Sequence, residues 1–597
     1  MSISNFIFLL FCIYSINCQQ LGNKLEGKPF YQFSQTSSNL FEEDVSTKFI
    51  LSSKDRWTGV ELSSPAKLTK IGFTHLSSET KDYFLGIFEG ANDKNFYDAF
   101  PLYMIKEEIE PDKINFFQIS CPQTFKYFRY VSPKSKNSSI SIFEIYGTYE
   151  SNKDSLKEDM FQPTNLPLFV INSENGEMPQ GRDKQTKINA NFVIVNEGKV
   201  NIKKTGTIKL RGNSSLNSEK KPYLIHFDEK TKILDMPAKA KKWTLIPNMY
   251  DKTLMRNILG YQMSFIFGLK YSPSCRYIDL ILNGDYRGNY LICDKIEVGE
   301  GRVDITKMDE TCIKEPEISG GYFVQGQGVS LSGDSETFTT AKGITLAYEY
   351  PEFKDITEEQ KNYLKNKFDE IEAKIYENIT ENIDLESFTR YFLVEEFSAN
   401  QDAIFNSFFL YKERSDDKIY FGPVWDFDLA FDNAMTLYPT NQKKNFAYKF
   451  TNSNGSTDKF LSNLLSNDTV LQKVKDTWKL MTNTVFTKEV MRNYINEQIK
   501  YINESQRLNF IRWDVLNSRQ FLEAVIRGSF EAEVDYLKEY VEERFDVFGE
   551  IVSNATPASV QEEYPRPRPW GTHGGKNHWK KGENKLRGGW RNDNDNN

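Results

Sequence analysis

The sequence predicts a multidomain chain: an all-β sandwich over residues 19–150, then an α+β domain with a helical C-terminal half over residues 166–548. Short apolar stretches alternate with polar turns through the first range, a spacing typical of sandwiches. In the second range strand-like stretches come first and helical patterns follow, as is typical of the α+β class. The polar residues 151–165 are predicted to link the two units.

Composition indicates a soluble protein and excludes several classes. Of the 597 residues, 39% are hydrophobic and 26% are charged, which is enough apolar surface for large cores. These values exclude a collagen, a low-complexity chain and a multispan membrane protein. The net charge of -8 argues against nucleic-acid binding by the main body. Only four histidines are present, which leaves little for a zinc cluster or a Ser-His-Asp triad.

Residues 1–18 have the features of a signal peptide. Their apolar run from Phe6 to Ile16 is too short to cross a membrane and has the length of a signal-peptide core. The alternative is a buried N-terminal strand. No later segment offers ~18 uninterrupted apolar residues, so we expect no transmembrane segment. The protein is predicted to be secreted, or to stay in the secretory-pathway lumen or at the cell surface.

Cysteines and glycosylation sequons agree with export. Removal of residues 1–18 leaves Cys121, Cys275, Cys293 and Cys312. Four cysteines allow three disulfide pairings, which sequence alone does not separate, and free buried thiols are the alternative. The N-x-S/T sequons begin at Asn137, Asn213, Asn378, Asn454, Asn467, Asn503 and Asn554. In an exported glycoprotein most of them would lie in surface loops.

Several motifs within residues 19–150 together suggest a known fold. They are Trp57 with Val60-Glu61-Leu62, Ile71-Gly72-Phe73, Phe88-Glu89-Gly90-Ala91-Asn92-Asp93, Phe128-Arg129-Tyr130-Val131, and Ile142 to Gly147. Through them this range resembles the discoidin-like (coagulation-factor C-type, galactose-binding-like) jelly roll. The resemblance implies a domain that binds a glycan or a cell-surface ligand. It does not identify that ligand, because one fold serves many functions.

The end of the chain, residues 549–597, is predicted to be a disordered basic tail. From Tyr564 onward it contains eight Lys or Arg residues and three acidic ones, a charge of +5, so the rest of the chain carries -13. Such a composition cannot bury enough apolar surface to fold. We expect a solvated segment, and contact with an anionic glycan, phosphate or cell wall is the alternative.

Two pairs of polar side chains lie in apolar surroundings in the second unit. Asp402 and Asn406 are four residues apart, and Asp426 and Asp428 bracket Phe427. In an extended segment residues i and i+2 point the same way, so the second pair of carboxylates would share one face. Buried carboxylates without cations are costly, and a divalent metal removes that cost. The alternative is that these aspartates cap turns.

A second polar group of residues precedes them in the chain. A predicted strand ends at Arg211, the next residues Gly212, Asn213, Ser214 and Ser215 form a tight polar turn, and Lys221 precedes another apolar strand. Backbone N–H groups of a turn beside a strand-borne lysine can bind phosphate oxygens. Many polar hairpins share this pattern, so it becomes informative only together with the aspartates.

These groups belong to a series of sequence blocks that follow one another in a fixed order. The blocks are Leu166 to Ile171, Arg211 to Ser215, Lys220 to Ile225, Trp243 to Asn257, Asn283 to Ile296, Ile318 to Tyr322, Tyr350 to Glu352, the block around Asp402, and Gly422 to Phe431. Through them residues 166–548 resemble the spore coat protein H (CotH) family of atypical, secretory-pathway protein kinases. No single block decides this, and their number and order carry the resemblance.

The resemblance implies an enzyme that transfers the ATP γ-phosphate to Ser or Thr of secreted or surface proteins, with Mg²⁺ or Mn²⁺ as cofactor. It makes Asp402 the catalytic base, which takes the proton of the acceptor hydroxyl. It makes Asn406 and Asp426 metal ligands, with Asp428 as a further one. These roles suit a reaction that needs mainly positioning and charge neutralisation.

The resemblance also implies a set of nucleotide-binding residues. They are Arg211, Gly212, Asn213, Ser214, Lys221 and Asp294. The lysine would bind phosphate oxygens, and the arginine with the following turn would cover them. A turn that lines the nucleotide would leave the Asn213 sequon unglycosylated.

Two other functions remain as alternatives. Asp428 replaces the glycine of the D-F-G motif of ordinary protein kinases, and Asp294 is shorter than the Glu expected there. The first alternative is therefore a catalytically inactive surface or adhesion (invasin-like) protein. The second is a glycosidase with paired carboxylates. It is disfavoured because aspartates at i and i+2 are poorly placed to flank a glycosidic bond at separations of ~5–9 Å.

Overall fold

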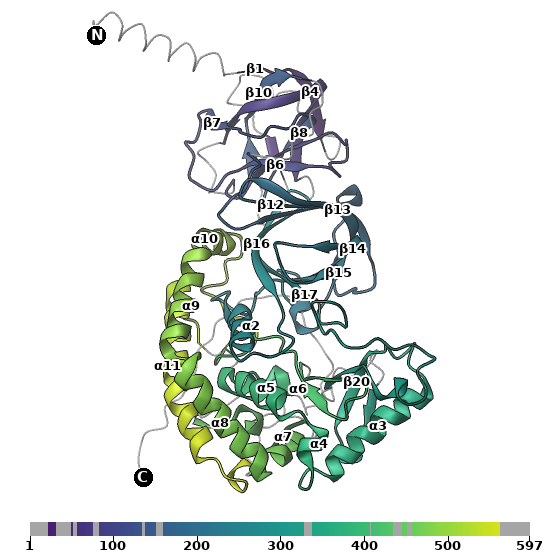
Figure 1. Cartoon of the computed structure of the whole chain (residues 1–597). Coiled ribbons are helices and arrows are strands. Elements are labelled where there is room, and N and C mark those ends of the chain that lie inside the picture. The colour runs from purple at the N-terminus through teal and green to yellow at the C-terminus, as the bar shows by residue number, and fades with distance from the viewer. Residues whose placement is uncertain are drawn as a thin grey trace, which may run out of the picture.

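The computed structural model describes most of the chain between Gly22 and Gln561. The described residues are 22–31, 49–51, 56–75, 83–133, 138–150, 159–326, 337–405, 407–433, 444–450, 457–523 and 525–561. The predicted signal peptide, Asn406, the sequons at Asn137 and Asn454, and the chain from residue 562 onward lie outside them. Figure 1 shows the sandwich at the top, a β-barrel in the middle and a helical part below.

The first unit is a β-sandwich, as predicted. Its strands are β1 (Asn23–Lys24), β2 (Gly27–Tyr31), β3 (Phe49–Leu51), β4 (Trp57–Thr74), β5 (Ile87–Ala91), β6 (Phe100–Met104), β7 (Asn115–Gln118), β8 (Phe125–Val131), β9 (Ser138–Ile140) and β10 (Ile142–Tyr149). The larger sheet has the order β1-β10-β4-β8-β5-β6, and β3 pairs with β9. The long strand β4 pairs with β2 and β8 through its first half and with β10 and β7 through its second. This one strand therefore joins both halves of the unit.

Seven strands of the second unit close into a barrel. They are β11 (Leu168–Ser173), β12 (Ile188–Asn196), β13 (Lys199–Leu210), β14 (Tyr223–Lys232), β15 (Lys239–Ile246), β16 (Cys275–Leu282) and β17 (Asp285–Asp294). Their order is β11-β12-β13-β14-β15-β17-β16, and the parallel pair of β11 and β16 closes the ring. Because side chains alternate along a strand, Ile208 and Leu210 of β13 lie in the barrel core while Lys209 lies on the outer face.

The remaining elements are a small sheet and a helical layer. The sheet holds β18 (Tyr322–Gly326), β19 (Thr337–Thr339), β20 (Thr345–Tyr350), β21 (Phe409–Lys412) and β22 (Ile419–Phe421) in the order β19-β20-β18-β21-β22. The helices are α2 (Arg256–Ile266), α3 (Glu358–Ala373), α4 (Ile379–Asn382), α5 (Leu385–Ser398), α6 (Asp402–Phe405), α7 (Thr457–Leu465), α8 (Asp468–Thr484), α9 (Lys488–Tyr501), α10 (Asn503–Arg512) and α11 (Phe530–Asn554). The helical second half is therefore confirmed. In the described part of the chain, no helix combines the length and apolar character needed to span a membrane.

Local sequence signals explain where these helices begin. Thr357 and Gln360 form a capping box at the start of α3, and the Asp384 side chain accepts a hydrogen bond from a backbone N–H at the start of α5. Such caps pair N–H groups that have no partner inside the helix. At the other end, α11 extends to Asn554, and Val560 beyond it is buried. The segment predicted as a tail from residue 549 therefore begins inside a packed helix.

The sandwich and the second unit share one hydrophobic core. The residues that the second unit contributes to the sandwich cluster are Leu168, Val170, Val195, Ile281, Tyr286 and Leu508. Met160, in the predicted linker, is buried in the same cluster. Polar contacts reinforce the junction: Arg56 forms an ion pair with Asp285 at 3.3 Å, and Asn172 Nδ2 donates to the carbonyl oxygen of Ala99 at 2.7 Å. The two units are therefore packed against each other and not merely tethered.

The four cysteines that follow the predicted signal peptide are free and buried in this structure. They are Cys121, Cys275, Cys293 and Cys312. Cys275 and Cys293 lie directly opposite each other on β16 and β17, and the other two lie on separate segments. Free buried thiols, one of the two alternatives from the sequence, are thus what the structure contains.

Candidate active site

The candidate site forms where the end of α5 meets residues 422–433. α5 ends at Ser398, and Ala399 adopts a left-handed conformation with φ of 51°. This turns the chain toward Asp402, the first residue of the short helix α6. In the second segment Asp426 is also left-handed, with φ of 64°. Outside glycine this conformation is tolerated best by Asn and Asp, so an aspartate suits the position.

Asp402, Asp426 and Asp428 form one electrostatic cluster of half-buried carboxylates. Burial raises the pKa of Asp402 to about 7, and the charge of Asp426 adds to the rise. Burial also raises the pKa of Asp426, while the Arg211 guanidinium and a hydrogen bond with Asp428 lower it. The pKa of Asp428 lies well above its usual value because of burial and the charges of Asp426, Asp402 and Asp251. Ionisation of the whole cluster therefore needs a cation beside it.

A basic pocket of about 280 Å³ adjoins this cluster, between the outer face of the barrel and the small sheet. Its lining residues are Lys184, Lys209, Leu210, Arg211, Gly212, Leu224, Thr244, Lys295, Ile296, Gln325, Glu349, Phe409 and Trp425. Lys209, Leu224 and Thr244 are neighbours across β13, β14 and β15 and together form one wall. The small sheet supplies the opposite wall through Gln325 and Phe409.

Arg211 and Trp425 connect the pocket to the carboxylates. Both residues line the pocket, and the guanidinium carbon of Arg211 lies 5.6 Å from the centroid of the Trp425 ring. The same guanidinium lowers the pKa of Asp426, the residue that follows Trp425. An anion in the pocket would therefore contact the Arg211 guanidinium on the side of the pocket that faces Asp426.

Lysines make the pocket strongly positive. Lys184, Lys209 and Lys295 line it. Burial lowers the pKa of Lys209, and four neighbouring lysines lower it further. Within the described part of the chain the Lys209 side chain has no hydrogen bond or ion pair, so its ammonium group is available to a bound anion. A concentration of positive charge of this kind suits phosphate oxygens.

The structure places the predicted turn at the edge of the pocket. Arg211 and Gly212 line it. Asn213 and Ser214 are exposed, and Asn213 Oδ1 accepts a hydrogen bond from Lys184 Nζ at 3.3 Å. Arg211 and the first residue of the turn therefore face the pocket, whereas Asn213 and Ser214 lie at the protein surface.

Lys221 and Asp294 are engaged elsewhere. Lys221 Nζ donates to the carbonyl oxygen of Leu216 at 2.5 Å. The buried Asp294 carboxylate accepts hydrogen bonds from Arg302 Nε and from the Ser274 N–H, both at 3.0 Å. Neither side chain lines the pocket. The predicted metal ligand Asn406 lies outside the described residues.

Sequence reasoning missed several pocket residues. Lys209 stands two positions before Arg211, at the end of β13, so the period-two alternation of a strand was a signal that could have identified it. Lys295 follows Asp294 directly, in a block that was already recognised. Thr244 and Glu349 come from distant strands and give no local signal. Their position depends on how the barrel packs against the small sheet.

The carboxylates fit a hard divalent cation. In the residues that the structure describes, no group of three or more His, Cys, Asp or Glu side chains is arranged as a metal site. Mg²⁺, however, is commonly held by one or two carboxylates together with substrate phosphates and water. Asp426 and Asp428, which share a hydrogen bond and have raised pKa values, supply such a pair.

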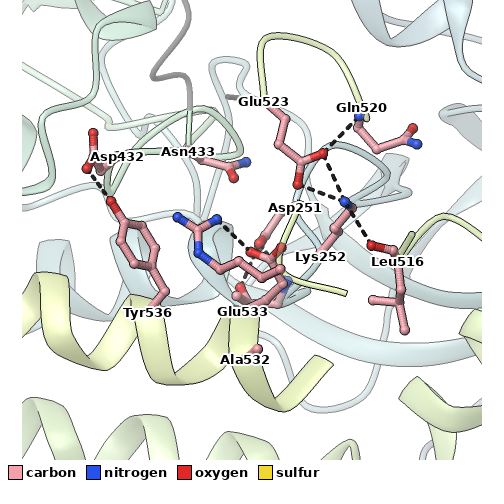
Figure 2. Close-up of polar contacts among 12 residues, drawn as sticks. Asp251, Lys252, Asp432, Asn433, Leu516, Gln520, Glu523, Ala532, Glu533 and Tyr536 are labelled. Atoms are coloured by element: carbon pink, nitrogen blue, oxygen red, sulfur yellow. Dashed lines mark hydrogen bonds and ion pairs between the residues drawn. The ribbon is translucent and has the colours of Figure 1, made fainter. Parts of the chain in front are cut away.

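Figure 2 shows a network of polar contacts and ion pairs around Asp251 and Lys252. In the segment before α2, Asp251 forms an ion pair with Arg256, and both are fully buried. The neighbouring Lys252 donates to Glu523 Oε2 at 2.9 Å and to two backbone carbonyls of the segment that leads to α11. Because Asp251 also raises the pKa of Asp428, this network reaches the carboxylate cluster.

Comparison at the level of protein families agrees with this geometry. The family model described as CotH kinase protein matches residues 208–548, more than half of the 597-residue chain. The chain belongs to the CotH kinase family. The matched range begins in β13 and ends in α11, so the basic pocket and the carboxylates of this CotH kinase family protein lie almost wholly inside it. No curated protein matches the chain.

Some solved structures are similar to a smaller part of this CotH family chain. A family 62 carbohydrate-binding module from Clostridium thermocellum Xyl5A is 28% identical, with a TM-score of 0.20, and the match covers 21% of this chain and 96% of that one. Module CBM32-6 of CpGH89 from Clostridium perfringens is 14% identical, with a TM-score of 0.18, over 21% of this chain and 94% of that one. The CBM32 of AlyQ, solved with 4,5-unsaturated mannuronic acid, is 10% identical, with a TM-score of 0.18, over 21% and 98%.

Proposed function

We propose that this protein is an exported atypical protein kinase that transfers the ATP γ-phosphate to Ser or Thr of secreted or surface proteins. The observation that carries the proposal is the junction of a basic pocket with a carboxylate cluster through Arg211 and Trp425. Phosphoryl transfer requires mainly positioning and neutralisation of charge. The pocket supplies cationic side chains for the phosphate oxygens, and the cluster supplies carboxylates for a divalent metal and for the acceptor hydroxyl.

The pocket residues would bind and orient the nucleotide. Lys209, Arg211 and Lys295 line one connected space and would neutralise the phosphate chain. The backbone of Gly212 can approach a phosphate closely because its φ of 92° is a conformation that L side chains rarely adopt. Mg²⁺ or Mn²⁺ held by Asp426 and Asp428 would supply further neutralisation of the transferring group.

Asp402 would act on the acceptor hydroxyl. A general base works best when its pKa lies near the operating pH, and burial together with the Asp426 charge raises the pKa of Asp402 to about 7. The carboxylate would accept a hydrogen bond from the hydroxyl of a Ser or Thr side chain. It would take the hydroxyl proton as the bond from that oxygen to the γ-phosphorus forms and the bond from phosphorus to the oxygen of the departing ADP breaks. Its half-buried position leaves room for a protein substrate to reach it.

Binding and transfer are tested separately. The full chain is melted with and without ATP and Mg²⁺ or Mn²⁺, where a ligand at a hundredfold excess over Kd stabilises the native state by ~2.7 kcal/mol. We expect this shift for the wild type and its loss in Asp426→Ala. Asp402→Asn should keep the shift but lose phosphate transfer to a protein acceptor. An Asp402→Asn variant that transfers phosphate at the wild-type rate would contradict its role as base.

The alternative, an inactive surface or adhesion protein, has its own outcome in the same experiment. Such a protein would show no shift with nucleotide and metal. A shift that is equal in the wild type and in Asp426→Ala would also favour it, because the nucleotide would then bind without the carboxylate cluster.

We further propose that the sandwich binds a glycan or a cell-surface ligand. A cleft of about 680 Å³ between the sandwich and the barrel supports this, a volume in the range of ligand sites. Its lining includes the carboxamides of Asn92, Gln123, Asn172 and Asn191. The Oδ1 atom of Asn172 is buried without a hydrogen-bond partner, so a donor group of a ligand would satisfy it. Thr205, exposed at the rim, is a suitable position for a block.

The glycan proposal is tested on the full chain with a glycan array. We expect binding by the wild type and its loss in Thr205→Trp, which fills the cleft from an exposed position. Thr207→Trp is the matched control, because Thr207 lies two residues further along the same strand and does not line the cleft. Equal binding by the wild type and Thr205→Trp would place the ligand elsewhere.

Export is tested by expression of the full chain in eukaryotic cells. The proposal rests on the apolar run from Phe6 to Ile16. We expect the protein in the medium, the lumen or at the surface, with an N-terminus at or near Gln19. An intracellular protein that retains residues 1–18 would contradict it.

A further inference from the structure

One hydrogen bond from α2 reaches the middle of the segment that carries the two carboxylates. The Phe427 N–H donates to Asn257 Oδ1 at 2.8 Å, in a buried position. Phe427 stands between Asp426 and Asp428, so the orientation of its backbone determines where both side chains begin. Asn257 is itself held in place, because its Nδ2 donates to Asn248 Oδ1 at 3.0 Å.

The same face of α2 also holds the aromatic rings of this segment. A Cβ at Gly260 would lie 2.4 Å from the Phe427 ring, so only a glycine lets the ring sit there. Tyr261 stacks on Trp425 with 5.8 Å between ring centroids and meets Phe427 edge-on at 5.9 Å. Residues three and four positions after Asn257 lie on its side of the helix. One helical face therefore contacts both the backbone and the rings.

The segment needs such support for two reasons. Asp426 is left-handed, with φ of 64°, a conformation that L-residues adopt only when their surroundings hold them there. In addition, Asp426 and Asp428 repel each other when both are ionised. Asn433 Nδ2 donates to the carbonyl oxygen of Asp428 at 2.6 Å, which fixes one end of the segment. The bond to Asn257 fixes its centre.

We propose that Asn257 is a positioning residue for phosphoryl transfer. It fixes the Phe427 backbone, so that Asp426 and Asp428 keep the geometry needed to bind the metal–nucleotide complex. The role of Asn257 in phosphoryl transfer rests on the proposed function, whereas its restraint of the Phe427 backbone does not. Asn257→Ala would leave a buried N–H without an acceptor, an unfavourable state that can be relieved if the segment moves. Movement of Phe427 would carry both carboxylates with it.

The test compares Asn257→Ala with Asn248→Ala in the full chain. Both asparagines are buried, at 0% and 2% exposure. Asn248 also has a φ of 48°, which asparagine tolerates better than alanine, so Asn248→Ala disturbs the fold at least as much as Asn257→Ala. Asn248→Ala removes the bond behind Asn257 but leaves the acceptor for the Phe427 N–H. Two properties are measured: hydrogen–deuterium exchange of the peptide that contains Phe427, and the affinity for Mn²⁺·ATP by calorimetry.

We expect Asn257→Ala to exchange about tenfold faster at Phe427 and to bind Mn²⁺·ATP about tenfold more weakly, the effect of one lost buried hydrogen bond. Asn248→Ala should change each property by less than about threefold. Asn257→Asp, which keeps an acceptor oxygen, should keep the slow exchange and serves as the second variant if Asn257→Ala does not fold.

Two results would overturn the inference. One is an Asn257→Ala variant with wild-type exchange at Phe427. The other is an equal loss of Mn²⁺·ATP affinity in Asn257→Ala and Asn248→Ala, which would reduce Asn257 to a general structural role. A wild-type protein that does not bind Mn²⁺·ATP contradicts the proposed function instead. In that case the exchange rate at Phe427 alone decides whether Asn257 restrains the segment.

Discussion

The guanidinium of Arg211 lies over the Trp425 ring, with 5.6 Å between the guanidinium carbon and the ring centroid. The charge of Arg211 also lowers the pKa of Asp426, the residue that follows Trp425 in the chain. Arg211 is thus a member of both the basic pocket and the carboxylate cluster. Arg211→Met should weaken Mg²⁺·ATP binding at least about tenfold, since it removes a charge-assisted contact.

Arg211→Lys provides the matched comparison for that variant. Lysine keeps the charge but loses the planar group that stacks on an aromatic ring. We expect an affinity between those of the wild type and Arg211→Met, measured by calorimetry. Equal affinities of the wild type and Arg211→Met would remove Arg211 from the nucleotide site.

Lys209 and Lys221 should differ sharply in their effect on nucleotide binding. Lys209 lines the pocket, whereas the Lys221 ammonium donates to the carbonyl oxygen of Leu216. Lys209→Met should therefore weaken Mg²⁺·ATP binding about tenfold or more, and Lys221→Met should change it by less than about threefold. Each affinity is measured by calorimetry on the full chain. The reverse ranking would support the assignment made from sequence.

Phosphate transfer should rise with pH through neutrality. Burial and the charge of Asp426 raise the pKa of Asp402 to about 7, and only the ionised carboxylate can accept the hydroxyl proton. The kcat/KM for Mg²⁺·ATP, which reports the free enzyme, is therefore low below about pH 6 and levels off above about pH 8. A pH profile of kcat/KM with Mg²⁺ tests this. A rate that is flat from pH 5 to 8 would exclude Asp402 as a titrating base.

Stability should fall as pH rises, in part because of Glu396. Burial raises the pKa of its carboxyl from 4.5 to about 7, although the N–H groups of Ala447 and Tyr448 and the charge of Arg544 oppose the rise. Between these two values the folded protein holds a proton that the unfolded chain has lost, so the free energy of unfolding decreases by up to about 3 kcal/mol as pH rises through this range. Urea unfolding at several pH values measures this slope.

Glu396→Gln isolates that contribution. The glutamine cannot titrate, so the variant should lose less stability than the wild type between pH 5 and pH 8. Other buried carboxyls with raised pKa values that do not depend on Glu396, such as Glu533, remain in both proteins and cancel in the comparison. Identical slopes would show that Glu396 stays ionised through this range.

Asp285 should matter more for stability than its partner Arg56. The Asp285 carboxylate pairs with Arg56 at 3.3 Å, Arg287 at 2.9 Å and Arg512 at 3.3 Å. Asp285→Ala leaves these arginines without their shared partner and should destabilise the protein by roughly 3–5 kcal/mol. Arg56→Ala leaves two of the three pairs and should cost about 1 kcal/mol. Urea unfolding of both variants measures the difference, and equal costs would contradict the ranking.

The order of units could be predicted from sequence because it depends on local patterns. Short apolar stretches between polar turns identified the sandwich strands, and helical patterns identified the second half of the chain as helical, in agreement with the observed helices. The shared core could not be predicted in this way. Val170 and Ile281 have the pattern of any buried strand residue, and only the fold shows that the sandwich covers them.

The candidate site was predictable to a similar, partial degree. Asp402, Asp426 and Asp428 stand out because charged side chains in apolar surroundings are costly without a purpose, and the structure brings the three together. The lysines were harder. Lys220 and Lys221 are adjacent in the sequence, yet the first is buried and donates to Asn289 and Asn509. Which side chain faces a pocket depends on strand orientation, which the letters alone do not fix.

The joint core of sandwich and barrel has a consequence for how such a chain can evolve and be engineered. A module that is only tethered can be exchanged between genes as an independent cassette. Here Leu168, Val170 and Ile281 would become solvent-exposed if the sandwich were removed, because its side chains now cover them. A swap of this module therefore has to bring compensating substitutions in the barrel with it. Recombination at residues 151–165 would separate two sets of side chains that now form one hydrophobic core.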